Sequence, residues 1–243
     1  MDGQAVQTII EQVKEPVALD GRTYLPEGWK LSDPAVPEAD PLKLYALGAL
    51  VDYVASLHDA EASKGVIVVQ TPTTVELLGP LEGEDKKFRR HAFARAEVPA
   101  FGFQLGTYMP LEHFVINARV HFVQSPKRDE LISLVSAISE SDVRDSNDDG
   151  VKQEVTTKRG LRLGRETVEP IWNLAGYRTF REVEQPEADF IVRVRGGGEA
   201  PSIALFAADG DAWKIEAVAR VGQKIRDLFA ERFKDFPAPR VFA

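Results

Sequence analysis

The strongest candidate for a chemical site is an acidic segment with the spacing of a calcium-binding loop. Residues 145–150 are Asp-Ser-Asn-Asp-Asp-Gly, which place ligand oxygens at the first, third and fifth positions and glycine at the sixth. Thr156 stands at the twelfth position, where such a loop needs a bidentate glutamate. We therefore predict that Asp145, Asn147 and Asp149 belong to an Asx-rich turn between a helix and a sheet, without a bound metal.

Residue types that carry out catalysis are otherwise scarce or badly spaced. The chain has no cysteine, which excludes disulfides, thiolate zinc sites and cysteine nucleophiles. There is no GxSxG motif and no P-loop, and Gly196–Gly198 lies between two predicted strands. No two histidines have the spacing that would bring them together on one helix face: they are His58, His91, His113 and His121. We therefore predict no catalytic residue and no cofactor.

Two basic clusters could contact phosphate or another subunit. The first cluster is preceded by acidic residues, and this order of acids before bases favours a self-complementary or subunit contact. The acidic residues are Glu82, Glu84 and Asp85, and the basic residues are Lys86, Lys87, Arg89 and Arg90. The second cluster is a possible phosphate contact or the exposed face of strands, and consists of Lys158, Arg159, Arg162 and Arg165. A net charge of −8 argues against a dedicated duplex-DNA protein, so nucleic acid is not a favoured partner.

The first residues and the apolar stretches predict a cytoplasmic protein without a membrane partner. Residues 1–16 combine acidic residues with an amphipathic pattern, unlike the basic stretch and apolar block of a secretory signal. The longest apolar stretches, such as Ile203–Ala208, are far too short to cross a bilayer.

The N-terminal part is predicted to contain helices, an extended arm and a hairpin. Helical spacing covers Gly3–Lys14, and residues 16–40 carry repeated prolines around an isolated Trp29, which favours an arm laid over a surface. Apolar residues with helical spacing predict a further helix over Pro41–His58. Residues 65–98 are predicted to form a projecting hairpin that carries the first charged cluster at its tip.

The C-terminal part is predicted to be an antiparallel sheet closed by the last helix. Before it, residues 114–138 form a long central helix with a kink at Pro126, or two stacked helices. The predicted strands are Gln153–Thr157, Arg162–Val168, Tyr177–Val183, Phe190–Arg195 and Ser202–Ala207. Helix Ala212–Phe233 is expected to close this sheet with Trp213 buried against it. The result is an α+β protein with an N-terminal region at 1–40, one domain at 41–236 and a tail at 237–243.

Five segments have an order that resembles a known group of proteins. They are LGALVDYVASLHD, LEHFVINARVHF, DDGVKQEV, YRTFREVEQPEADFIVRVR and ADGDAWKIEAVARV. This layout resembles an uncharacterised phage and prophage family, the YfdQ-like proteins, over about residues 42–230. The resemblance implies a phage or prophage origin and supplies no catalytic residue. The order of arm, helix, hairpin, long helix, sheet and terminal helix is also similar to HK97-type capsid and encapsulin subunits, which implies an HK97-like fold.

These observations favour a non-enzymatic phage protein that self-assembles into a closed homo-oligomer or a shell-like particle. The proline-rich arm, the charged hairpin tip and the lack of catalytic motifs support this hypothesis, with Trp29 and the tip at the interface. The second hypothesis is an early phage protein that acts on nucleic acid or on a host defence factor. An enzyme of unrecognised type is the third.

Overall fold

The computed structural model describes two units of the chain, residues 1–39 and 40–243. In the first unit it describes strands β1 (Val17–Leu19) and β2 (Arg22–Tyr24), which pair antiparallel. In the second it describes residues 40–56, 64–83, 88–139, 171–196, 201–233 and 238–243, and the backbone of strands at 142–148, 153–159 and 162–168. The predicted helix at 3–14, Trp29 and most of the predicted arm lie outside the described residues.

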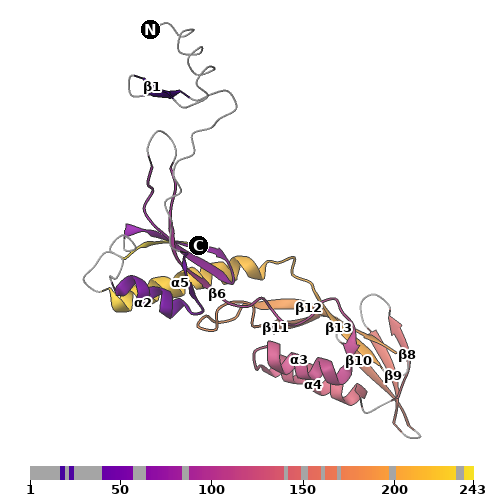
Figure 1. Ribbon diagram of the computed structural model, residues 1–243. Helices are drawn as coiled ribbons and strands as arrows, with labels where there is room; N and C mark the ends of the chain where they lie inside the picture. The colour runs from indigo at the N-terminus through magenta and orange to yellow at the C-terminus, as the bar shows by residue number, and fades with distance from the viewer. Residues whose placement is uncertain are drawn as a thin grey trace. The chain divides into compact units, whose positions relative to one another are not determined.

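A five-stranded sheet covered by two helices forms the first core of the second unit (Figure 1). The strand order is β14-β4-β5-β6-β3, where β4, β5 and β6 are antiparallel neighbours and the two edge strands pair in parallel. The strands are β3 (Leu42–Leu44), β4 (Val66–Thr71), β5 (Thr74–Leu78), β6 (Ala92–Glu97) and β14 (Arg240–Phe242). Helices α2 (Leu47–Ala55) and α5 (Trp213–Arg232) contact each other, and Arg232 forms an ion pair with Asp52.

Helical and strand periods in the sequence account for this core. Helix α5 buries one residue in every turn: Ala217, Val221, Ile225 and Phe229. Helix α2 buries Leu47, Leu50, Val51 and Val54. The sheet contributes Ile67, Val75 and Leu77, each fully buried. Burying one side chain of this size stabilises the fold by about 1.5–3 kcal/mol, so these stripes hold the helices on the sheet.

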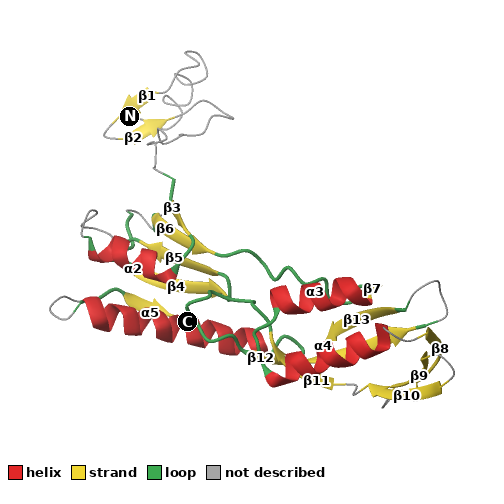
Figure 2. Cartoon of the chain, turned by 90° about the horizontal axis from the view of Figure 1, so that it is seen from below, coloured by secondary structure: helices red, strands yellow, loops and turns green. Residues whose placement is uncertain are grey.

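A four-stranded antiparallel sheet covered by two other helices forms the second core (Figure 2). The strand order is β11-β12-β13-β7, and the strands are β7 (Met109–Pro110), β11 (Ile171–Ala175), β12 (Glu187–Arg195) and β13 (Ser202–Ala207). Every second residue of β12 is buried, from Ala188 to Val194, as expected for a strand covered on one face. Helices α3 (Leu111–His121) and α4 (Pro126–Ser139) supply that cover.

The predicted role of the final helix is wrong. We expected α5 to close the C-terminal sheet, but it packs on α2, β4 and β14, while α3 and α4 cover the C-terminal sheet. Trp213, at the first turn of α5, contacts the second core and is half-buried instead of buried. The periodicity of a helix reveals its apolar face, but it does not reveal which of two sheets that face covers.

The predicted long central helix is divided into α3 and α4. The chain leaves helical geometry at Phe122, which has an extended backbone. After it, hydrogen bonds to residues 175–177 replace those of the helix: the N–H of Val123 donates to the carbonyl of Ala175, and the N–H of Tyr177 donates to the carbonyl of His121. The hydroxyl of Ser125 accepts a hydrogen bond from Arg128 N at 3.1 Å and caps α4. The alternative of two stacked helices is therefore confirmed.

A third sheet and a loop replace parts of the single sheet that we predicted. Strands β8 (Asp142–Asp148), β9 (Gln153–Arg159) and β10 (Arg162–Val168) form a separate three-stranded antiparallel sheet. Residues 177–186 form a loop with turns instead of the predicted strand, and β11 is a strand that we did not predict. Both faces of a strand at 177–183 would mix apolar and charged residues, and the segment is instead a loop that contacts two cores.

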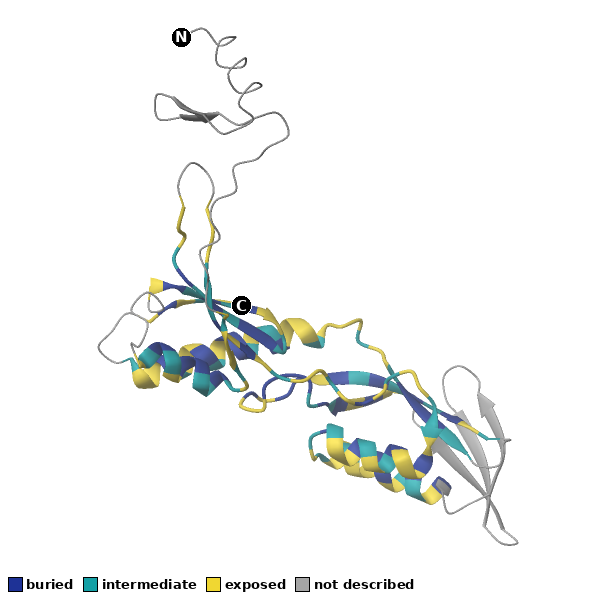
Figure 3. Cartoon of the chain, in the orientation of Figure 1, coloured by how far each residue is buried: buried dark blue, intermediate teal, exposed yellow. Residues whose placement is uncertain are grey.

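The α+β class is confirmed, and the predicted hairpin is present. Beyond β5 and β6 the two arms continue as a ribbon, in which Glu82 and Arg89 exchange two backbone hydrogen bonds of 2.9 and 2.8 Å. Figure 3 shows that the outer part of this ribbon is exposed. Within the predicted tail, residues 240–242 form strand β14 at the edge of the first sheet. Among the described residues, no helix has the length and apolar character needed to cross a bilayer.

Candidate functional site

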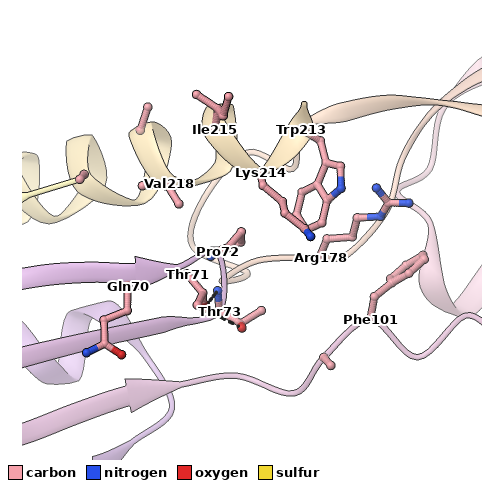
Figure 4. A pocket seen from close by; sticks show the side chains of 13 residues that line it. Gln70, Thr71, Pro72, Thr73, Phe101, Arg178, Trp213, Lys214, Ile215 and Val218 are labelled. Atoms are coloured by element: carbon pink, nitrogen blue, oxygen red, sulfur yellow. Dashed lines mark hydrogen bonds between the residues drawn. The ribbon is translucent and has the colours of Figure 1, made fainter. Parts of the chain in front are cut away.

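A pocket of about 780 Å³ lies where the loop at 177–186 meets the start of α5 (Figure 4). Its walls are the turn between β4 and β5 at 70–73, residues 100–101, Arg178, the first two turns of α5, and Ala243. The lining is mostly apolar, with the rings of Phe101 and Trp213 and the aliphatic side chains of Ile215 and Val218. This size and character are typical of pockets that bind small molecules.

Arg178 is the most unusual residue of this pocket. Its side chain is 3% exposed, and its Cζ atom lies 4.9 Å from the ring centre of Phe101, 4.6 Å from that of Phe190 and 4.8 Å from that of Trp213. Figure 4 shows the guanidinium beside the indole of Trp213, at one end of the pocket. Cation–π attraction to three rings compensates part of the free energy of removing this charge from water.

The guanidinium of Arg178 is incompletely paired. Its Nη2 atom is buried and has no hydrogen-bond partner in the part of the chain that the structure describes. Burial lowers the pKa of Arg178, whereas the negative charges of Asp209 and Asp211 act in the opposite direction. A buried donor without a partner is rare in proteins, since each one destabilises the fold, and it calls for a specific explanation.

Gln185 holds the loop that positions Arg178. The side-chain Oε1 of Gln185 accepts hydrogen bonds from the backbone N–H groups of Arg178 and Thr179 at 2.9 and 3.1 Å. Its Nε2 donates to the carbonyl oxygens of Phe180 and Val183 at 2.9 and 3.0 Å. One buried amide thus satisfies four backbone groups of a loop that has no sheet partner of its own.

The same loop is anchored on the five-stranded sheet and its helices. Phe180 is fully buried in the first core, and the hydroxyl of Thr179 donates to the carbonyl of Pro72 in the turn that lines the pocket. Glu182 accepts hydrogen bonds from the N–H groups of Leu47 and Gly48, both at 2.8 Å, at the N-terminus of α2. Arg178 therefore lies on a segment that contacts both cores.

The turn before α5 places two carboxylates near the pocket. Asp209 accepts hydrogen bonds from the N–H groups of Asp211 and Trp213, each at 3.3 Å. Asp211 has a φ angle of 68°, in the left-handed region, and follows Gly210 with a φ of 58°. Lys214 donates to the Asp211 carboxylate at 2.7 Å, and this hydrogen bond is the main reason why the pKa of Asp211 is lowered. The cation of Lys214 is thus already paired.

The hairpin ribbon is the second candidate surface, and it includes part of the predicted interface. Glu82 and Arg89 occupy one face of the ribbon, because they form a directly opposed pair. Leu81 and Phe88, which precede them in the two arms, are both on the other face and are 56% and 59% exposed. Arg90 donates to the carbonyl of Gly79 at 2.7 Å. The other predicted interface residues, Glu84, Asp85, Lys86, Lys87 and Trp29, lie outside the described residues.

The predicted acidic turn is a strand. Asp145 and Asn147 lie in β8, where Asp145 pairs with Thr156 and Asn147 with Glu154, and Asp149 lies outside the described residues. A strand keeps successive residues on opposite faces, so its backbone cannot fold around an ion as a calcium loop does. Among the described residues, no group of acidic or histidine side chains could hold a metal ion.

The second basic cluster divides between two paired strands. Lys158 and Arg159 end β9, and Arg162 and Arg165 belong to β10. The register pairs Arg162 with Arg159 and Leu163 with Lys158, so Arg159 and Arg162 share one face of the sheet, and Lys158 and Arg165 belong to the other. None of the described residues that line the pocket belongs to this cluster.

The histidines and Arg178 show what the sequence could and could not predict. His121 packs edge-on against Phe101 with 6.0 Å between ring centres, His91 lies 3.5 Å from Glu82, and His58 lies outside the described residues. We missed Arg178 as a site residue, because it follows a tyrosine in a segment that resembles a strand. No spacing in the sequence marks it, because its environment is made by Phe101, Phe190 and Trp213.

Comparisons of this chain with protein-family models, with curated proteins and with solved structures found no match. The resemblance to the YfdQ-like family and the capsid-like order of segments therefore remain predictions.

Proposed function

We propose that this chain is a non-enzymatic protein that self-assembles into a closed homo-oligomer or shell-like particle, with the hairpin ribbon as one contact surface. A phage or prophage origin and a cytoplasmic location are part of this proposal, and they rest on the sequence. The observation that supports self-assembly best is the exposure of Leu81 and Phe88 on one face of the ribbon.

A two-stranded ribbon has few internal contacts that could stabilise it. Isolated two-stranded hairpins are at best marginally stable in water, and a third strand or a packed face is normally required. The ribbon face with Leu81 and Phe88 gains that packing if it meets an apolar face of another molecule. Burial of about 100 Å² of apolar surface contributes roughly 2.5 kcal/mol, so such a contact would add to the stability of an assembly.

A second copy of the same chain is the partner that fits this surface. In a two-fold contact each ribbon presents the same face to the other, so Leu81 and Phe88 of one copy meet Phe88 and Leu81 of the next. The charged tip has acidic residues before basic ones, and an antiparallel approach of two copies pairs opposite charges. Exposed ion pairs contribute about 0–1 kcal/mol each, so they orient the contact while apolar burial provides affinity.

The test is the mass in solution of the full chain and of two matched double variants. Static light scattering should give a multiple of the 26.9 kDa chain mass at micromolar concentration. Leu81→Ser with Phe88→Ser should reduce that mass. Ile116→Ser with Val120→Ser on α3 is the control, because these residues are similarly exposed, at 52% and 56%. A monomeric mass for the unmodified chain would overturn the proposal, and equal effects of both pairs would overturn the role of the ribbon.

A further inference from the structure

We propose that the pocket beside Arg178 binds a small organic acid, a monocarboxylate with an apolar chain or ring, whose carboxylate pairs with the guanidinium of Arg178. The residues that carry this inference are Arg178, Phe101 and Trp213, with the first turns of α5 as the apolar wall. This site is independent of the proposed self-assembly, because none of its lining residues belongs to the hairpin ribbon.

The lining of the pocket selects an apolar body for the ligand. Phe101 and Trp213 offer ring faces, and Ile215, Val218 and Ala219 offer aliphatic surface along one side of α5. Ile215 is 79% exposed, and a ligand that lies along α5 would cover its side chain. The pocket volume of about 780 Å³ is within the range of small-molecule sites.

The charges around the pocket select a single negative charge. Two cationic side chains line it, but Lys214 already pairs with Asp211 at 2.7 Å. Arg178 has no direct carboxylate partner among the described residues, and its Nη2 atom has no hydrogen bond. One carboxylate would supply the missing acceptor, and a guanidinium binds a carboxylate with two parallel hydrogen bonds.

A multiply charged ligand fits this site less well. Asp209 accepts a hydrogen bond from the N–H group of Trp213 and Asp211 from Lys214, and both donors line the pocket, so the two carboxylates would repel a second negative charge. A phosphate group would need more than one unpaired cation or several free N–H donors, and the N–H groups of Asp211 and Trp213 are occupied by Asp209. The chemistry of the pocket therefore favours monocarboxylates over phosphate esters.

The test uses octanoate as the probe and the full chain as the protein. Isothermal titration calorimetry should show saturable binding of octanoate, and the tryptophan fluorescence of the chain should change in parallel, because Trp213 lines the pocket. Octan-1-ol has the same chain without the charge and should bind about tenfold more weakly or worse, because a hydrogen bond to a charged group is lost. Inorganic phosphate should not compete. Equal binding of octanoate and octan-1-ol, or displacement by phosphate, would overturn the proposal.

Two variants distinguish the contribution of the Arg178 charge to ligand binding from the contribution of the apolar lining. Arg178→Gln should weaken octanoate binding about tenfold or more and leave octan-1-ol binding unchanged. The matched control is Arg181→Gln, since Arg181 is exposed, stacks 3.4 Å from the ring centre of Tyr177 and does not line the pocket. Octanoate binding that survives in Arg178→Gln, or that falls equally in Arg181→Gln, would contradict the assignment.

A second variant keeps the proposal testable if Arg178→Gln does not fold. Ala219 is exposed on α5 and lines the pocket, so Ala219→Phe fills the pocket without touching the buried loop. This variant should retain its thermal unfolding midpoint and lose binding of both octanoate and octan-1-ol. Unchanged octanoate binding in a folded Ala219→Phe variant would show that the ligand binds elsewhere and would overturn the proposal.

Discussion

At the scale of single residues, buried polar side chains decide the local structure around the pocket. Gln185 is 8% exposed and satisfies four backbone groups of the loop at 177–186. Thr179, also buried, depends on it for its N–H group, while the N–H group of the buried Arg178 donates to it and to the carbonyl of Gly176 at 2.8 Å. A loop with these backbone groups unsatisfied would not remain buried between two cores, because each unpaired group destabilises the fold.

Replacing Gln185 with alanine should lower the free energy of unfolding by about 2–3 kcal/mol, because several buried backbone groups lose their partner. Chemical denaturation measures this change. The control is Gln223→Ala, since Gln223 is exposed on α5 and contacts Asp227 at the surface, and we expect a change within about 0.5 kcal/mol. If both variants have the same stability, the loop does not depend on Gln185.

The pKa of Asp211 predicts a small dependence of stability on pH. A hydrogen bond from Lys214 lowers the pKa of this carboxyl in the folded protein. The resulting stabilisation is present above the pKa of the unfolded chain and is lost as the pH falls through the lower folded value. Asp211→Asn tolerates the positive φ angle but lacks the charge, so it should be less stable than the unmodified protein at about pH 7 and equally stable at about pH 2. A deficit that persists in acid would contradict this account.

Chemical candidates in the sequence were a weak guide to the site. The acidic segment matched a calcium loop in spacing, yet strand pairing determines its backbone. Arg178 could not be recognised, because its environment is made by Phe101, Phe190 and Trp213, which are distant in the chain. Burial and convergence of this kind depend on tertiary structure and leave no spacing that can be recognised in one sequence.

At the scale of elements, the N-terminus of helix α2 is capped by a side chain from a distant segment of the chain. Its N-cap residue, Ala46, has no side chain that can accept a hydrogen bond, and Glu182 accepts from Leu47 and Gly48 instead. The carboxylate also lies at the N-terminus of the helix, where the partial charge of the helix is positive. This contact fixes the loop at 177–186 on α2.

Replacing Glu182 with alanine should therefore lower stability by about 1 kcal/mol, the usual effect of losing an N-cap side chain. The measurement is the midpoint of urea denaturation. Glu184→Ala is the control, because Glu184 is exposed and its contact is an ion pair with Arg220 at 3.4 Å, worth about 0–1 kcal/mol. A larger effect for Glu184 than for Glu182 would exclude the capping role.

Elements with strong periodicity were predictable, and elements defined by distant contacts were not. Helix α5 and strands β12 and β13 follow from apolar spacing along the chain. The break between α3 and α4 depends on hydrogen bonds from residues 123 and 177, which the sequence does not reveal. The segment at 177–183 has the β-branched and aromatic residues of a strand, but Gln185 gives its backbone other partners.

At the scale of the whole unit, two cores are joined by the loop at 177–186. Phe180 enters the core of the five-stranded sheet, while Arg178, two residues earlier, lies on the aromatic rings of the other core. The loop therefore couples the stability of the two cores. The sequence predicted one domain from 41 to 236, but it contained no signal that this domain has two separate cores.

Phe180→Ala should reduce the free energy of unfolding by about 3–5 kcal/mol, because it removes a fully buried ring. Differential scanning calorimetry should still show one transition in the unmodified protein, since the loop links the cores. Ile116→Ala is the control, because Ile116 is 52% exposed on α3 and has no part in the proposed contact, and we expect a change within about 0.5 kcal/mol. Two separate transitions in the unmodified protein would contradict the coupling.

The position of β14 beside β4 has a consequence for how the chain folds. Strand β4 forms its parallel pair with residues 240–242, and its sheet is covered by α5, so the first core needs residues from both ends of the second unit. The buried residues of the second core all come from one stretch of the chain, Phe103 to Leu205. Contacts between residues close in the chain form sooner, because less loop-closure entropy is lost. Pulsed hydrogen exchange during refolding should therefore protect β12 and β13 before β4, and during synthesis on a ribosome the five-stranded sheet should stay incomplete until α5 and β14 emerge.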